Sequence, residues 1–129
     1  MVAIDTNIIV RLLTRDDIEQ YKISRRLFET EEIFIPDTVI LETEWVLRFA
    51  YEFTPKDICG SLRKLFGLSN VCLSNGQLIA QTLDWHENGL DFADAFHLSL
   101  SQQQSTLKTF DENFIKRSKK LSKCRVEKP

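Results

Sequence analysis

The sequence predicts an α/β domain in which helices cover both faces of a mainly parallel sheet. Two features of the chain lead to this class. Short apolar runs alternate with longer amphipathic segments, and only four glycines and three prolines interrupt the 129 residues. Strands that are covered on both faces are short continuous apolar runs, and helical connections between them make the sheet parallel.

The predicted strands are residues 2–4, 33–35, 71–73 and 106–110. Most of the remaining sequence is predicted to be helical, and several segments open with residues that cap helices. Thr54 followed by Pro55 is typical of a cap and a first helical position, and Thr6 or Asn7 can cap the first helix. The predicted helices lie within residues 6–15, 17–32, 38–52, 54–68, 75–87, 89–100 and 112–121.

Size and composition favour one domain. With 43% hydrophobic and 28% charged residues, the chain is predicted to form a single domain over residues 1–129, with a basic C-terminal segment from about residue 116. No apolar run approaches the ~20 residues that span a bilayer, and no basic stretch precedes the apolar N-terminus. We therefore expect a cytoplasmic protein that does not associate with membranes.

The C-terminal segment concentrates positive charge, although the net charge of the chain is −2. Seven of its 17 Lys and Arg residues lie between residues 116 and 128. Such a stretch is either a solvated helix face or a surface that contacts phosphates, and both interpretations stay open. The candidate phosphate contacts are Lys116, Arg117, Lys119 and Lys120.

Two carboxylates directly follow predicted strands. Asp5 comes after the first strand and Asp111 after the last. Ligands bind at the carboxyl ends of parallel strands, so both residues are candidates for a binding site. Each could equally cap the helix that follows it.

Glu42 is predicted to lie on an apolar face of its helix. At about 100° per residue, its neighbours on that face include Trp45 and Phe49. Glu44 is predicted to lie on the opposite, solvated face, four residues before Arg48, with which it can pair. A glutamate among apolar side chains needs a compensating charge, which either a buried arginine or a bound cation could supply.

Two further carboxylates open the segment GLDFADAFHLSL, residues 89–100. Asp91 is predicted to be the N-cap of a helix and to accept a hydrogen bond from the N–H of Asp94. One acid is sufficient for a cap, so Asp94 remains available for another role. His97 shares the face of Asp94 and is interpreted as a structural histidine.

The carboxylates of these segments could converge above one edge of a parallel sheet. Carboxylates packed that closely repel each other and remain ionised together only around a cation. Oxygen ligands without cysteine suit Mg²⁺ or Mn²⁺, and such an ion can activate water for attack on a phosphodiester. The predicted set is Asp5, Glu42, Asp94 and Asp111.

Four motifs, AIDTN, IPDTVILETEWVL, GLDFADAFHL and TFDENF, occur in this order across residues 1–121. Together they resemble a PIN domain, specifically a VapC-type toxin ribonuclease. The resemblance implies a three-layer α/β/α fold, Mg²⁺ dependence with Mn²⁺ as a substitute, cleavage of RNA, a homodimer, and a small VapB-like antitoxin as partner. It implies that the four acids are catalytic and metal-binding, that the basic segment contacts RNA, and that the supporting residues are Thr6 and Asp91.

Two alternatives of similar architecture stay open. A phosphoacceptor signalling domain also gathers acids at the edge of a parallel sheet, but it needs paired acids after the first strand and an acceptor Asp after the middle strand. The sequence offers AIDTN and VCLSN at these places. The second alternative is a non-catalytic binding module in which the acids are only caps and ion-pair partners.

Overall fold

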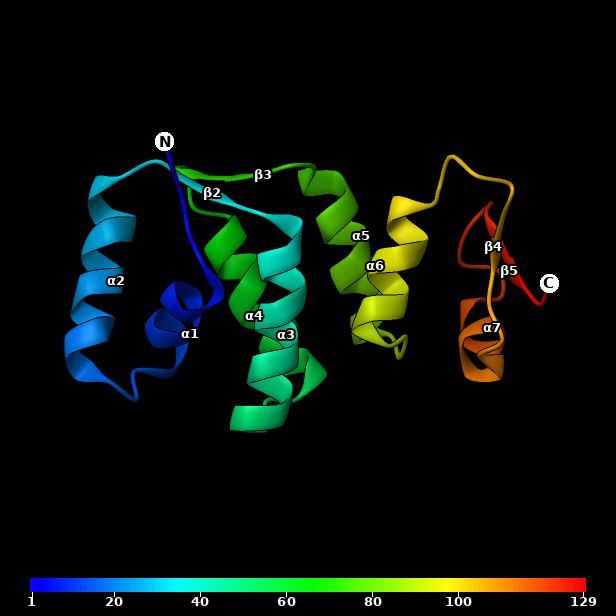
Figure 1. Ribbon diagram of the computed structural model, residues 1–129, viewed down its shortest axis with the longest axis horizontal. Coiled ribbons are helices and arrows are strands. Elements are labelled where there is room, and N and C mark those ends of the chain that lie inside the picture. The colour runs from blue at the N-terminus through cyan, green and yellow to red at the C-terminus, as the bar shows by residue number, and fades with distance from the viewer. The chain divides into compact units, whose positions relative to one another are not determined.

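The computed structural model describes residues 1–129, which form two compact units, Met1–Gly76 and Gln77–Pro129 (Figure 1). The first unit contains a three-stranded parallel sheet and the second a two-stranded parallel sheet. Parallel strands flanked by helices confirm the predicted α/β class. The prediction of one domain over the whole chain stays a prediction. None of the helices combines the length and the apolar composition that crossing a bilayer requires.

The sheet of the first unit is built from the three N-terminal apolar runs. The strands lie in the order β1-β2-β3, so that Val2 pairs with Ile33 and Ile33 with Val71. Ile33 and Ile35 are fully buried, as their position in a central strand requires. These strands are β1 (Val2–Ala3), β2 (Ile33–Ile35) and β3 (Val71–Leu73).

Four helices accompany this sheet, and α1 packs against both α2 and α3. Thr54 caps the fourth helix by accepting a hydrogen bond from the N–H of Asp57 at 3.2 Å, with Pro55 at the first helical position, as predicted. The first helix is capped by Asp5 and not by Thr6 or Asn7. The helices are α1 (Thr6–Thr14), α2 (Ile18–Thr30), α3 (Asp37–Tyr51) and α4 (Pro55–Phe66).

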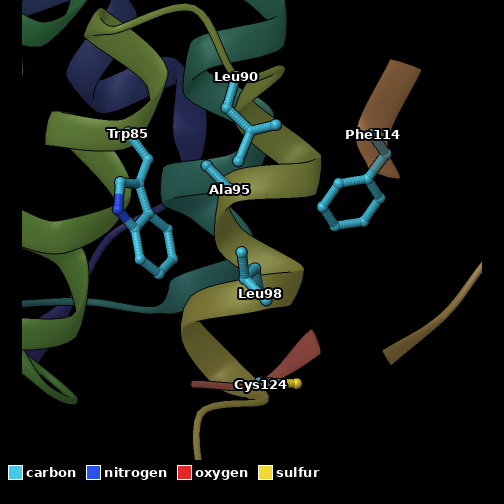
Figure 2. Packing of buried hydrophobic residues seen from close by; sticks show 6 residues of the cluster. All are labelled: Trp85, Leu90, Ala95, Leu98, Phe114 and Cys124. Carbon is cyan, nitrogen blue, oxygen red and sulfur yellow. The ribbon is translucent and has the colours of Figure 1, made fainter. Parts of the chain in front are cut away.

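The second unit combines helices with the C-terminal strands. Its two strands are parallel, and Thr106 pairs with Arg125 and Lys108 with Glu127. Figure 2 shows part of its hydrophobic core, to which Trp85, Leu98 and Phe114 belong. The elements are α5 (Gly76–Glu87), which begins at the last residue of the first unit, α6 (Phe92–Leu100), β4 (Thr106–Lys108), α7 (Glu112–Ser118) and β5 (Arg125–Glu127).

A tight turn joins α5 to α6 and determines where Asp91 begins the second helix. Gly89 has a φ of 112°, a conformation that favours glycine. Its N–H donates to the carbonyl of His86, while the N–H of Leu90 donates to the carbonyl of Trp85. This is the Schellman pattern of a helix C-terminus, and it places Leu90 in the core immediately before Asp91.

The C-terminal segment differs from the prediction. We predicted a basic helix over residues 112–121 followed by a tail, but α7 ends at Ser118 and residues 125–127 form β5. The sequence RVE contains a single apolar residue, so no apolar run marks this strand. Pairing with β4 stabilises it, together with a 2.8 Å ion pair between Lys108 and Glu127.

Candidate active site

Asp5 lies where the first strand of the sheet meets the first helix. The N–H of Ile4 still donates to the carbonyl of Phe34 on β2, and the chain then turns into α1. Asp5 has an extended backbone and caps α1, its Oδ1 accepting from the N–H of Thr6 at 2.7 Å. The side chain is exposed, and only one of its oxygens is engaged in this cap. The carboxylate is therefore held at the carboxyl end of β1 with an oxygen available for a ligand.

Thr6 links the start of α1 to α3. Its side chain is buried, and its Oγ1 donates to Oε1 of Glu42 at 2.5 Å. Glu42 is exposed on the second turn of α3, the helix that follows β2. The first unit therefore brings Asp5, Thr6 and Glu42 together, and the short hydroxyl-to-carboxylate hydrogen bond fixes the orientation of Glu42.

A pocket of about 390 Å³ opens beside this group. One wall comes from α1, where Asn7 and Arg11 are four residues apart and share a helix face. The other wall comes from α3, where Glu42, Val46 and Ala50 follow one another at intervals of four. The pocket is acidic at the end formed by the two carboxylates.

The predicted faces of α3 are wrong. The buried residues of this helix are Ile40, Thr43, Glu44 and Leu47, spaced as one helical stripe. Glu44, which we expected on the solvated face, is 1% exposed, whereas Trp45, which we expected beside a buried Glu42, is 57% exposed. The stripe that contacts neighbouring elements therefore contains a glutamate and a threonine, and aromatic residues lie outside it.

The predicted pair between Glu44 and Arg48 is confirmed, although its environment differs. Arg48 Nε lies 2.9 Å from Glu44 Oε2, and the glutamate side chain is 2% exposed against 36% for the arginine. Because an arginine compensates the charge of this buried carboxylate, no bound cation is needed to explain its burial. The buried ion pair with an arginine that we considered for Glu42 is therefore formed by Glu44.

In the second unit, Asp91 and Asp94 occupy the predicted positions. Asp91 is the N-cap of α6, and its Oδ2 accepts from the N–H of Asp94 at 3.2 Å. Asp94 is the third residue of the helix and is partly buried. Its own carboxylate accepts no hydrogen bond from the protein. The cap is therefore complete without the side chain of Asp94.

The environment of Asp94 disfavours its charge. Burial is the largest cause that raises the pKa of this carboxyl from 3.8 to about 6; the negative charges of Asp91 and Asp111 also contribute, and His97 partly opposes them. Asp111 is the N-cap of α7, its Oδ1 accepting from the N–H of Phe114 at 3.1 Å. The second unit thus brings three acids into electrostatic contact, and one of them lacks a compensating partner.

The basic residues of α7 are exposed, and one of them, Arg117, has a hydrogen-bond partner. Arg117 Nη1 donates to the carbonyl of Gly89 at 3.2 Å, which attaches α7 to the turn between α5 and α6. Lys116 and Lys119 line a pocket of about 540 Å³ that also contains Glu112. Acids beside these lysines reduce the local positive charge, so the prediction of an RNA-contacting surface stays a prediction.

A family model described as the PIN domain matches residues 2–120 of the chain. The chain belongs to the PIN domain family. This confirms the family resemblance that the four motifs predicted. Among solved structures, the chain is similar to VapC20 of Mycobacterium tuberculosis, described as a toxin that cleaves the sarcin-ricin loop, with 16% sequence identity and a TM-score of 0.45, covering 88% of this chain and 92% of that one. No curated protein matches the sequence.

The acids of this PIN domain suit a hard divalent cation by their chemistry. All are carboxylates, and no cysteine lies among them, which favours Mg²⁺ or Mn²⁺. Asp94 has a raised pKa and no hydrogen-bond donor, so positive charge beside it would stabilise its ionised form. In neither unit are three or more His, Cys, Asp or Glu side chains grouped as a metal-binding cluster. The individual residues fit the ion, and the ligand set stays a prediction.

Arg11 and Tyr51 line the acidic pocket of this PIN domain and were not predicted from the sequence. For Arg11 a signal was present, because it lies four residues after Asn7 and five after Thr6 on a predicted helix. Its long side chain and charge suggested an ordinary solvated residue. Tyr51 reaches Arg11 across 40 residues of sequence, a contact that no local pattern reveals.

Proposed function

We propose that this PIN domain is a Mg²⁺-dependent endoribonuclease and the toxin of a VapBC-type toxin–antitoxin pair. One observation supports the proposal most directly. Within a PIN domain, Asp5 at the end of β1 lies beside a Glu42 carboxylate that Thr6 orients, and both carboxylates open into one pocket. An oriented acidic pair at the carboxyl edge of a parallel sheet is suited to holding a cation against a phosphate group.

The proposed ligands of the ion are the carboxylates of Asp5, Glu42, Asp94 and Asp111. When bound, Mg²⁺ or Mn²⁺ would lower the pKa of a water molecule and neutralise charge on the phosphodiester. Thr6 orients Glu42 through its hydroxyl, and Asp91 caps the first turn of α6, which contains Asp94. A bound cation would lower the pKa of Asp94, because its positive charge would offset the burial and the neighbouring acids that raise this pKa.

The further parts of the proposal concern partners. We expect Lys116, Arg117, Lys119 and Lys120 to help attract RNA, since an acidic centre alone repels a polyanion. We also expect a homodimer, a cytoplasmic location and inhibition by a small VapB-like antitoxin. Support for these expectations comes from the family and from the VapC-type motifs.

The test is RNA cleavage with a matched pair of variants. Asp5→Asn should lose cleavage in Mg²⁺ and in Mn²⁺, because the amide cannot replace a charged ligand. Asp17→Asn is the control, since Asp17 also caps a helix of the first unit but does not line the pocket. It should cleave like the unmodified protein, because asparagine caps helices as well as aspartate does.

Two results would contradict the proposal. One is a folded Asp5→Asn variant that still cleaves RNA. The other is phosphorylation of an aspartate by a small phosphodonor in the absence of any cleavage, which would favour a phosphoacceptor domain. Chelation with EDTA should abolish cleavage, and activity that survives complete chelation would exclude the proposed metal dependence.

A further inference from the structure

The acidic pocket of the first unit contains one basic side chain. Arg11 lies on α1, and its guanidinium forms part of the same pocket wall as Asn7, while Asp5 and Glu42 form the acidic end. A pocket with two carboxylates repels the phosphates of RNA unless a cation offsets them. Arg11 is the only side chain of the pocket that carries permanent positive charge.

The guanidinium of Arg11 is held in a fixed orientation. Its Nε donates to Oε1 of Gln20 at 2.7 Å, and its Nη1 donates to Oδ1 of Asp16 at 2.9 Å and to the hydroxyl of Tyr51 at 3.2 Å. Tyr51 in turn donates to Oδ2 of Asp16 at 2.5 Å. The Nη2 group makes no hydrogen bond within the protein. The side chain is thus oriented by three acceptors and retains two N–H donors.

A structural ion pair alone does not explain this arrangement well. The side chains of Arg11 and Asp16 are 30% and 43% exposed, and ion pairs at such exposure add little to stability. Of the three residues that orient the guanidinium, Tyr51 lines the pocket, whereas Asp16 and Gln20 do not. A preoriented arginine with free donors is well suited to binding a phosphate group.

The position of Arg11 on α1 indicates which phosphate it would contact. Five residues of helix separate it from Thr6, a rise of about 7.5 Å along the helix axis. A phosphate held at the carboxylates would therefore lie too far along the groove for Arg11 to bind it. We infer that Arg11 binds the RNA phosphate adjacent to the one that is cleaved and positions the strand along the groove between α1 and α3.

This inference rests on the proposed ribonuclease function and can fail independently of it. Binding is measured with a fluorescently labelled, mixed-sequence single-stranded RNA and the Asp5→Asn protein, which should bind without cutting. Arg11→Gln in that background should weaken binding about tenfold at low salt, as expected for one charged hydrogen-bonded contact. The slope of log Kd against log salt should fall by about 0.7, the value for one phosphate contact on a single strand.

Two further variants distinguish the effect of Arg11 on RNA binding from the effect of removing any positive charge from the first unit. Arg25→Gln is the matched control, because Arg25 is an exposed, ion-paired arginine of the same unit that does not line the pocket. It should leave both affinity and slope unchanged. Arg11→Lys retains the charge but not the fork of donors, so it should keep the salt slope of the parent protein and lose about threefold in affinity.

Catalysis gives a second readout that a purely structural role would not produce. In the cleaving protein, Arg11→Gln should raise KM by about tenfold and leave kcat within about twofold, since a contact to a neighbouring phosphate is present before and during the reaction. Thermal melting of each variant shows whether it is folded.

Unchanged RNA affinity and salt slope in folded Arg11→Gln would overturn the inference and point to an acidic protein partner for this residue. If Arg11→Gln does not fold, unchanged RNA affinity in folded Arg11→Lys would overturn it equally. Cleavage by Asp5→Asn, by contrast, would overturn the proposed function itself.

Discussion

Replacing Asp94 with asparagine should stabilise the metal-free protein at neutral pH. The pKa of Asp94 is raised from 3.8 to about 6, chiefly by burial. Ionising this carboxyl therefore costs the folded state more than the unfolded state, by roughly 3 kcal/mol if water were excluded completely. Because the side chain is only partly buried, water screens much of this cost, and we expect a stabilisation of about 1–2 kcal/mol for Asp94→Asn.

The pH dependence of this effect has a definite sign. A raised pKa means that the folded state binds the proton more tightly than the unfolded state does. The favourable contribution of protonated Asp94 is complete below about pH 4 and is lost as the pH rises through about 6. Asp94→Asn and the unmodified protein should therefore have similar free energies of unfolding near pH 4, and the variant should be more stable at pH 7.

The assay is urea denaturation in EDTA, followed by circular dichroism at several pH values. Asp57→Asn is the matched control, because Asp57 is also the third residue of a helix whose N-cap accepts its N–H, but it is exposed. It should lose stability slightly, since an exposed acid in the first turn interacts favourably with the helix dipole. Equal or lower stability of Asp94→Asn at pH 7 would refute the reasoning that burial and neighbouring acids disfavour this charge.

Three further substitutions, each with a comparison variant, test other parts of the molecule. Asp91→Ala should destabilise the protein by about 1 kcal/mol in urea denaturation through loss of the α6 cap, whereas Asp91→Asn should not. Thr6→Val should lower kcat for RNA cleavage by about tenfold because Glu42 loses its donor, and Thr6→Ser should restore it; equal rates would contradict the orienting role. Glu44→Gln should cost about 2 kcal/mol because it leaves Arg48 without its buried partner charge, and Glu42→Gln should leave the free energy of unfolding nearly unchanged.

Local sequence was sufficient for most elements and caps. Ile33 and Ile35 lie in an uninterrupted apolar run, and the structure buries both in β2. Thr54 with Pro55, and Asp91 three residues before Asp94, are arrangements that satisfy backbone N–H groups within one helical turn. Such features depend on neighbours in the chain, so the sequence alone predicted them.

The faces of α3 could not be predicted in this way. Trp45 and Phe49 suggested one buried stripe, yet the helix buries Thr43 and Glu44 instead. Hydrophobicity shows for which residues burial is energetically favourable. The contacts of α3 with α1 and α4, however, determine which face of the helix is buried. An arginine four residues further along then compensates the buried Glu44.

The sequence by itself determined the alternation of strands and helices, the order of the acidic motifs and hence the PIN family. These properties follow from local periodicity, capping and the residue types at strand ends. Only the tertiary structure decided that RVE forms β5, that Thr6 donates to Glu42 and that Arg11 meets Tyr51 beside the same pocket. Each of these contacts joins residues at least 19 positions apart, where the folded backbone and not the local sequence sets which side chains meet.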